Sequence, residues 1–483
     1  MYPKNFPCLP PQGLSPKELS ARIQLERSND LRWKEGKSFC LIYYPGDERA
    51  AIIKEAYNAL FYENALNPMS FPSLRKFENE VVKIVANLLG GNAATVGTMT
   101  SGGTESILMA VKTARDYARV NKPEIRNPEI IVPMTAHPAF EKACHYFNVK
   151  PIYIPVDPVS FKADIHATRN AITPETIMLV GSAPSYPHGV MDPVENLSEL
   201  ASEHKLLLHV DACIGGMILP FIKMNGGRVR SFDFSLPGVT SISVDLHKYG
   251  YAAKGASVIL YKNASLRKHQ FFVSTEWPGG IYGSASVSGT RPGAVIAAAW
   301  AALMSIGEEG YCEMAKSTMA TTEILIKGIR EIPELCLMGE SEMCIVAFTS
   351  NTINMYEVAD ELNSKGWHFE RLQNPPGLHL TVNYIHTSAI ASQFLNDLKD
   401  AVQKAGKFKL KNIGETIKVA AIKRLIKVLP QGTIAKIQSQ FSGSSAVTAT
   451  RTAPIYGMMG ALNGSKDLDE IVLDLLDKLN RID

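Results

Sequence analysis

Lys248 is the residue whose type and position point most directly to chemistry. In residues 239–246 apolar and β-branched side chains recur at every second position, which predicts a strand ending just before the lysine. Burial at a strand end lowers the pKa of a lysine because the charged form loses water, and a neutral amine is what Schiff-base formation requires. Gly250 would let the chain turn tightly after it. A surface lysine after a strand has the same local pattern, so other residues must distinguish the two.

Several predicted strands end in polar residues. Short apolar runs alternate with helical patterns between about residues 95 and 260, which predicts a mostly parallel α/β sheet. At the ends of these runs lie His137, Ser182, His209 with Asp211, and Lys248. Because ligands bind outside the carboxyl ends of strands in open α/β sheets, we expect these side chains to surround one site. Asp211 could instead cap a helix, and His137 could be a packed structural histidine.

The segment Ser101–Thr104 predicts an anion site. Its two glycines precede a predicted helix whose first N–H groups are free, and Thr104 adds a hydroxyl. The pattern favours a phosphate, although a Gly-Gly-Thr helix start is often only a cap. It matches neither the P-loop nor the dinucleotide fingerprint, so no nucleotide is implied.

Composition excludes several classes of protein. The net charge of +3 over 483 residues gives no reason to expect a nucleic-acid partner. The seven cysteines show no metal-ligand spacing, so we expect no metal site and a reducing compartment. No signal peptide or membrane-spanning run is visible, which predicts a soluble, cytoplasmic protein.

The chain length predicts more than one structural unit. We expect an N-terminal arm over residues 1–70, a large domain over 71–310, and a smaller C-terminal α/β domain over 311–483. Within the last, residues 404–427 form a basic amphipathic segment. It could make peripheral contact with an anionic membrane surface, but a solvated helix packed on its apolar side is the favoured interpretation.

The predicted site matches what pyridoxal 5'-phosphate requires. The aldehyde of this cofactor needs a lysine, its pyridine nitrogen needs a carboxylate, its phosphate needs a helix N-terminus, and its ring needs a stacking partner. Lys248, Asp211, the 101–104 segment and His137 would supply these in turn.

The motifs of this chain closely resemble those of sphingosine-1-phosphate lyases. They are SGGTESI (101–107), TAHPAF (135–140), PHGVMDP (187–193), LHVDACIGG (208–216), VTSISVDLHKYGYAAKG (239–255), WPGGIYGS (277–284), SGTRPG (288–293) and IYGM (455–458). The resemblance implies an α/β enzyme of the aspartate-aminotransferase-like fold (fold type I) that uses pyridoxal phosphate. It also implies an obligate homodimer with shared active sites. The eukaryotic members carry a membrane anchor that is absent here, so a bacterial-type enzyme is expected.

The resemblance also assigns roles to residues. Lys248 would carry the Schiff base, Asp211 would pair with the pyridine nitrogen and His137 would stack on the ring. Gly103, Thr104 and His247 would hold the cofactor phosphate, helped by Gly289 and Thr290 from the second subunit. Ser182 and His209 are further cofactor candidates at the strand ends. Tyr43, Asn67 and Lys254 would bind the substrate phosphate, with Asn67 standing where the family has histidine.

The activity implied is retro-aldol cleavage of a phosphorylated sphingoid base to a long-chain aldehyde and phosphoethanolamine. The Lys248 amine, Tyr249 and a phosphate oxygen are the candidate acid–base groups. One alternative is an amino-acid decarboxylase that uses the same cofactor and lysine. The other is a lipid-binding protein with a vestigial cofactor site, against which the intact set of cofactor residues counts.

Overall fold

A seven-stranded sheet forms the centre of the fold. The computed structural model describes residues 9–67, 69–408, 469, 472–473 and 476–477. The strands lie in the order β1-β7-β6-β5-β4-β2-β3. Their bounds are β1 Val96–Thr100, β2 Glu129–Pro133, β3 Lys150–Ile154, β4 Thr176–Ser182, β5 Leu207–Asp211, β6 Ser241–Asp245 and β7 Ser257–Tyr261. From β6 to β3 every pair is parallel, and only β7 is antiparallel to its neighbours β6 and β1.

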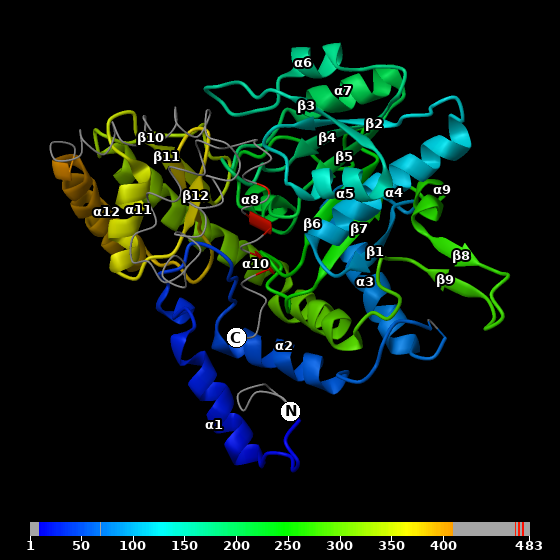
Figure 1. The fold of residues 1–483 in the computed structure, drawn as a ribbon, viewed down its shortest axis with the longest axis horizontal. Coiled ribbons are helices and arrows are strands. Elements are labelled where there is room, and N and C mark those ends of the chain that lie inside the picture. Colours follow the sequence, from blue (N-terminus) through cyan, green and yellow to red (C-terminus); the bar gives the residue numbers. More distant parts are fainter. Residues whose placement is uncertain (1–8, 68, 409–468, 470–471, 474–475, 478–483) are drawn as a thin grey trace, which may run out of the picture.

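Helices cover both faces of this sheet (Figure 1). They are α3 Pro72–Leu88, α4 Gly103–Asn121, α5 Ala139–Phe147, α6 Ile165–Asn170, α7 Val194–His204, α8 Leu219–Met224 and α9 Ala264–Arg267. In β2 the side chains alternate between two apolar clusters: Ile130 and Val132 pack with α4 and α5, whereas Ile131 packs with the cluster that contains α7 and α8. This two-sided burial explains why the strands are continuous apolar runs in the sequence.

A second, four-stranded antiparallel sheet follows the long helix α10 Gly293–Arg330. It contains β10 Cys336–Leu337, β11 Ile345–Thr349, β13 Gly377–Thr381 and β12 Glu370–Leu372 in that spatial order. Helix α11 Met355–Ser364 packs on β13, and α12 Ser388–Phe408 packs against α10 and α11. The domain boundary predicted at residue 310 falls inside α10, close to Gly307, whose φ of 65° interrupts the helical geometry. The three-part division of the chain stays a prediction.

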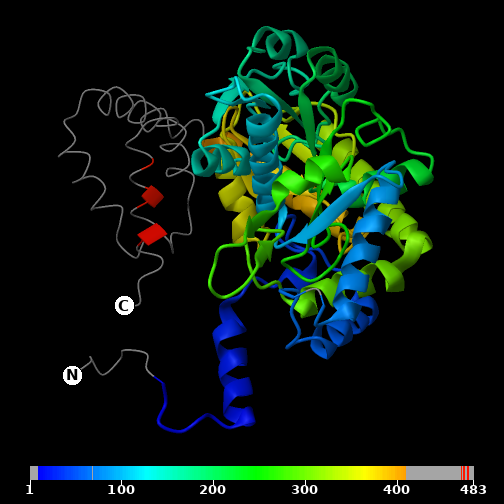
Figure 2. The same ribbon diagram turned by 90° about the vertical axis from the view of Figure 1, so that its right-hand side faces the viewer.

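The N-terminal segment lies along the outside of these layers. Helix α2 Asp47–Ala59 packs against α10, whereas α1 Pro16–Glu26 has no buried residue and projects away from the body (Figures 1 and 2). A two-stranded hairpin, β8 Phe272–Ser274 and β9 Tyr282–Ser284, extends from another side. In the described part of the chain, no helix combines the length and apolar character needed to cross a membrane. Most of the basic segment 404–427 lies outside the described residues.

Candidate active site

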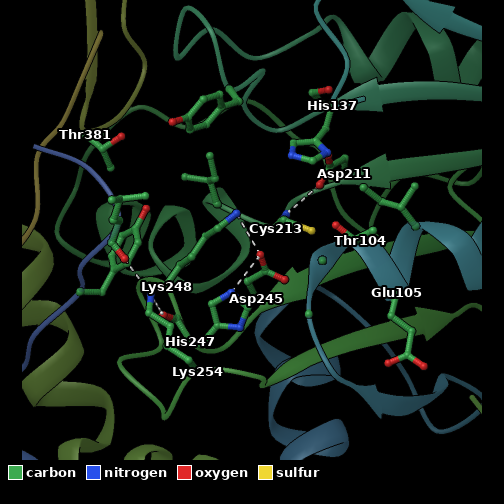
Figure 3. Close-up of a pocket in the computed structure, with 18 of the residues that line it drawn as sticks. Thr104, Glu105, His137, Asp211, Cys213, Asp245, His247, Lys248, Lys254 and Thr381 are labelled. Carbon is green, nitrogen blue, oxygen red and sulfur yellow. Dashed lines mark hydrogen bonds and ion pairs between the residues drawn. The ribbon is translucent and has the colours of Figure 1, made fainter. Parts of the chain in front are cut away.

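The strand ends predicted to converge do so. Strands β2, β4, β5 and β6 are consecutive and parallel, so their carboxyl ends share one edge of the sheet. A cavity of about 460 Å³ opens there. Figure 3 shows side chains from these ends, from the start of α4 and from the smaller sheet around it. The lining residues central to its chemistry are Tyr43, Ser101, Gly103, Thr104, His137, Ser182, Asp211, Asp245, His247, Lys248, Lys254 and Thr381.

Lys248 is held by an ion pair that the sequence did not predict. Its Nζ lies 2.9 Å from Oδ2 of Asp245, the last residue of β6, and Asp245 is only 3% exposed. Burial alone would lower the pKa of Lys248, but the Asp245 carboxylate outweighs burial and holds that pKa above its ordinary value. The expectation of a lowered pKa for Lys248 is therefore wrong in this geometry. The rule that burial lowers the pKa of a lysine fails here because the buried carboxylate of Asp245, three residues before Lys248, stabilises the charged amine.

The turn after β6 approaches its own strand closely. A Cβ at Gly250 would lie 2.5 Å from the carbonyl oxygen of Leu246, so this position has room only for glycine. The left-handed conformation expected of a tight turn falls at Tyr251, whose φ is 55°. A large residue in that conformation is strained, and such strain is typical of segments that hold a functional side chain.

Two hydrogen bonds to one oxygen hold the Asp211 carboxylate in place. Its Oδ1 accepts from the Cys213 amide at 3.0 Å and from Ser243 Oγ at 3.3 Å, and neither bond uses Oδ2. His209 is fully buried two residues earlier, and its ring nitrogens pair with Ser241 Oγ at 2.9 Å and Ser243 Oγ at 3.2 Å. His209 does not line the cavity, so its predicted contact with the cofactor is wrong in this geometry. Instead, His209 forms a hydrogen bond with Ser243, the serine that donates to Asp211.

His137 lines the cavity near Asp211 and exposes its ring to it (Figure 3). Its Nδ1 accepts a hydrogen bond from the Ala139 amide at 3.1 Å, which assigns the ring proton of the neutral form to Nε2. The surrounding protein lowers the pKa of His137 by removing it from water. A neutral, orientated imidazole is suited to stacking on a flat aromatic ring.

The segment before α4 has the shape of a phosphate site. A Cβ at Gly103 would lie 2.8 Å from Cys213 Sγ and 2.9 Å from both carboxylate oxygens of Asp245, so the cradle tolerates only glycine there. Asp245 Oδ1, His247 Nδ1 and Ser182 Oγ are buried and find no hydrogen-bond partner among the residues that the structure describes. Buried polar atoms without partners cost free energy, and a polar ligand in this cavity would satisfy them. These features fit pyridoxal phosphate.

Tyr43 and Lys254 line the same cavity and contact each other. Lys254 Nζ lies 5.1 Å from the centre of the Tyr43 ring and donates to the Leu41 carbonyl oxygen at 2.9 Å. Although Lys254 is exposed as a residue, protein atoms crowd its ammonium. This crowding, with the charge of Lys248 nearby, lowers the pKa of Lys254 to about 8. Burial raises the pKa of Tyr43, whose hydroxyl therefore stays protonated at neutral pH.

Besides His209, four of the predicted site residues do not line the cavity. Tyr249 is fully buried, and its hydroxyl donates to the Val382 carbonyl oxygen at 2.6 Å, so its predicted acid–base role is wrong in this geometry. Asn67 is exposed, and its Oδ1 accepts from the Met69 amide at 2.9 Å. Gly289 and Thr290 are exposed beside a different groove. The role expected for these two requires a second subunit.

Comparisons of the sequence with known proteins point to the same cofactor as the cavity does. The model of the pyridoxal-dependent decarboxylase conserved domain matches residues 33–351. The chain is 39% identical to a sphingosine-1-phosphate lyase of Dictyostelium discoideum over 98% of this chain and 82% of that protein. It is 45% identical to a sphingosine-1-phosphate lyase of Arabidopsis thaliana over 82% of this chain and 73% of that one. Because relatives come from several kingdoms, the expected bacterial origin stays a prediction.

Solved structures extend the agreement to the fold. A sphingosine-1-phosphate lyase of Burkholderia pseudomallei superposes with a TM-score of 0.81 at 38% identity, covering 85% of this chain and 96% of that one. A glutamate decarboxylase of Lactobacillus brevis gives a TM-score of 0.73 at 20% identity, covering 84% of this chain and 96% of that one, and shows the shared fold alone. Together with the lysine, carboxylate and phosphate cradle of the cavity, these matches place the chain in the pyridoxal-phosphate-dependent sphingosine-1-phosphate lyase family.

Proposed function

We propose that this enzyme cleaves phosphorylated sphingoid bases between the amine-bearing and hydroxyl-bearing carbons, releasing a long-chain aldehyde and phosphoethanolamine. The observation that carries the proposal is that two lysines, Lys248 and Lys254, line one cavity. Lys248 is positioned for the cofactor, and Lys254 offers a second cation near Tyr43, where an amino-acid decarboxylase would have no phosphate to bind. The names and high identities of the relatives support the same activity.

The residues of the cavity would hold pyridoxal phosphate at three points. Lys248 would carry the aldehyde carbon, Asp211 would face the pyridine nitrogen, and Gly103, Thr104 and His247 would receive the phosphate. When bound, this cofactor stores the electron pair left on the amine-bearing carbon as the carbon–carbon bond breaks. His137 would cover one face of the ring.

Asp245 favours the protonated form of Lys248 and is also positioned to receive the proton that this amine must lose. The amine must lose a proton to act as a nucleophile, and Asp245 Oδ2 lies 2.9 Å from Nζ, within hydrogen-bond distance. Once neutral and free, the same amine is a base inside the cavity. Tyr43 stays protonated and is therefore a hydrogen-bond donor to the substrate phosphate rather than a base.

A shared-site homodimer is part of the proposal. Gly289 and Thr290 do not reach the cavity of their own chain, and apolar side chains are exposed around them. Residues 65–66, 271–273, 283–286, 288–289 and 291 line one groove of about 300 Å³, and the nearby side chains of Trp277, Ile281 and Val287 are exposed. An exposed apolar patch of this kind is typical of a protein–protein interface.

The activity is tested by product analysis. Purified protein with added pyridoxal phosphate is incubated with a phosphorylated sphingoid base, the same base without phosphate, and a panel of amino acids, and products are identified by mass spectrometry. We expect a long-chain aldehyde and phosphoethanolamine from the phosphorylated base, with none from a Lys248→Ala control. Decarboxylated amines without aldehyde would overturn the proposal in favour of the decarboxylase alternative.

A further inference from the structure

Glu105 joins two segments that are far apart in the sequence. It is the third residue of α4, directly after the phosphate cradle, and is 7% exposed. Its Oε2 accepts from the Ser101 amide at 2.6 Å, and its Oε1 accepts from the Val287 amide at 2.8 Å. The first bond closes the turn of the cradle, whereas the second fastens the loop that continues to Gly289 and Thr290.

The charge of Glu105 is balanced by backbone groups. Within the described residues, no lysine or arginine forms an ion pair with it. Two N–H donors and the positive end of α4 stabilise the carboxylate, which is the arrangement that a buried charge requires. Figure 3 shows this carboxylate directed away from Lys248 and Asp245, so it does not face the reacting end of the cavity.

A second attachment holds the other end of the same loop. Arg291 Nη2 donates to Glu78 Oε2 at 2.9 Å, and Arg291 Nη1 pairs with Glu78 Oε1. Glu78 Oε1 also accepts from the Met99 amide at 3.0 Å, on the strand that leads into the cradle. Gly289 and Thr290 therefore lie between two attachments, and both attachments end on residues 99–105.

We propose that Glu105 is a positioning residue that couples the phosphate cradle of one subunit to the Gly289–Thr290 loop serving the partner subunit. The inference rests on the shared-site dimer of the proposed function. Closing the cradle around a cofactor phosphate fixes Ser101 and Glu105, and Glu105 in turn fixes the loop. Loading of one site therefore favours loading of the other, although the two cofactors do not share a ligand.

The test places the variant and the readout on different subunits. Mixed dimers are purified with two affinity tags, and one subunit carries Lys248→Ala, so that the visible absorbance band of attached cofactor reports only the other subunit's site. The reporting site receives Gly289 and Thr290 from the Lys248→Ala subunit. The Lys248→Ala subunit also carries Glu105→Ala, Glu105→Gln or the control Glu124→Gln. The dissociation constant of the cofactor at the reporting site is then measured by titration. Glu124 is an exposed carboxylate outside the cavity.

We expect Glu105→Ala to weaken cofactor binding at the unmodified site by about tenfold, because two amides lose a charged acceptor. Glu105→Gln keeps one acceptor oxygen and should have a smaller effect, and it serves if the alanine variant does not fold. Glu124→Gln should have none. A change of less than about twofold for both Glu105 variants would overturn the coupling. If Thr290→Ala on the same subunit is also silent, or light scattering finds a monomer, the shared-site dimer itself fails.

Discussion

Replacing Lys254 by alanine should separate recognition of the substrate phosphate from attachment of the cofactor. Lys254 contacts Tyr43 and the backbone carbonyl oxygens of Leu41 and His247, and none of these contacts involves Lys248, Asp211 or the His247 ring. The cofactor band of Lys254→Ala should therefore equal that of the unmodified enzyme. The loss should fall on the efficiency with a phosphorylated substrate.

The size of the loss follows from the contacts that Lys254 already makes. A charge-assisted hydrogen bond contributes about 1.5–3 kcal/mol, which corresponds to a factor of about 10 to 150 in kcat/KM. The Lys254 ammonium already donates to Leu41 at 2.9 Å and to the His247 carbonyl oxygen at 3.3 Å, so binding a phosphate exchanges bonds rather than adding them. Because the residue is also exposed, we expect the lower half of the range, about 10- to 40-fold.

The pH dependence of KM provides a second measure. With a pKa of about 8, Lys254 is an ammonium at neutral pH and loses its charge as the pH rises through that value. KM for the phosphorylated substrate should therefore increase above about pH 8 in the unmodified enzyme. In Lys254→Arg the guanidinium stays charged, so KM should stay constant up to about pH 9.

Steady-state assays from about pH 6.5 to pH 9, which brackets the pKa of Lys254, would test both statements. Lys262→Ala is a matched control, because the Lys262 ammonium also donates to a backbone carbonyl, that of Pro237 at 2.6 Å, and does not line the cavity. A Lys254→Ala enzyme with unchanged efficiency, or a Lys254→Arg enzyme whose KM follows the unmodified profile, would refute the role of this lysine.

Other predictions concern the cofactor and the departure from the family motif. Borohydride should fix the cofactor to the peptide that contains Lys248, and label on another lysine would contradict its assignment. Asp211→Asn should keep the visible band yet lose nearly all turnover, because a neutral amide does not keep the pyridine nitrogen protonated; near-native rates would make Asp211 structural only. Gly103→Ala should weaken cofactor binding by at least about tenfold, measured by titration, because its Cβ would lie 2.8 Å from Cys213 Sγ. Asn67→His should leave kcat/KM unchanged or raise it, and a fall would show that the amide is needed.

The sequence predicted the central sheet and the position of the cavity well, because both follow from local patterns. Parallel strands buried on both faces appear as apolar runs, and the polar residue that ends each run is visible without knowing the strand order. Strands β2, β4, β5 and β6 proved to be neighbours, so His137, Ser182, Asp211 and Lys248 meet at one edge.

Side-chain direction and long-range partners could not be predicted in the same way. Asp245 ends its strand as Asp211 does, and this signal was present, yet nothing local shows that its carboxylate pairs with Lys248. Tyr249 adjoins the reactive lysine in sequence, but its hydroxyl donates to the carbonyl oxygen of Val382, directly after β13. Glu105 was visible only as a helix residue, because its partner Val287 is 182 positions away.

The buried pair of His209 and Ser243 has a consequence for how pH profiles of this enzyme are read. Burial lowers the pKa of His209 to about 4, so the ring stays uncharged throughout the neutral and mildly acidic range. The serine that holds Asp211 therefore keeps the same donor and acceptor neighbours at every pH in that range. His209 and Ser243 therefore support the Asp211 carboxylate without any change of charge, and a bend in a rate profile near neutrality does not report on these two residues.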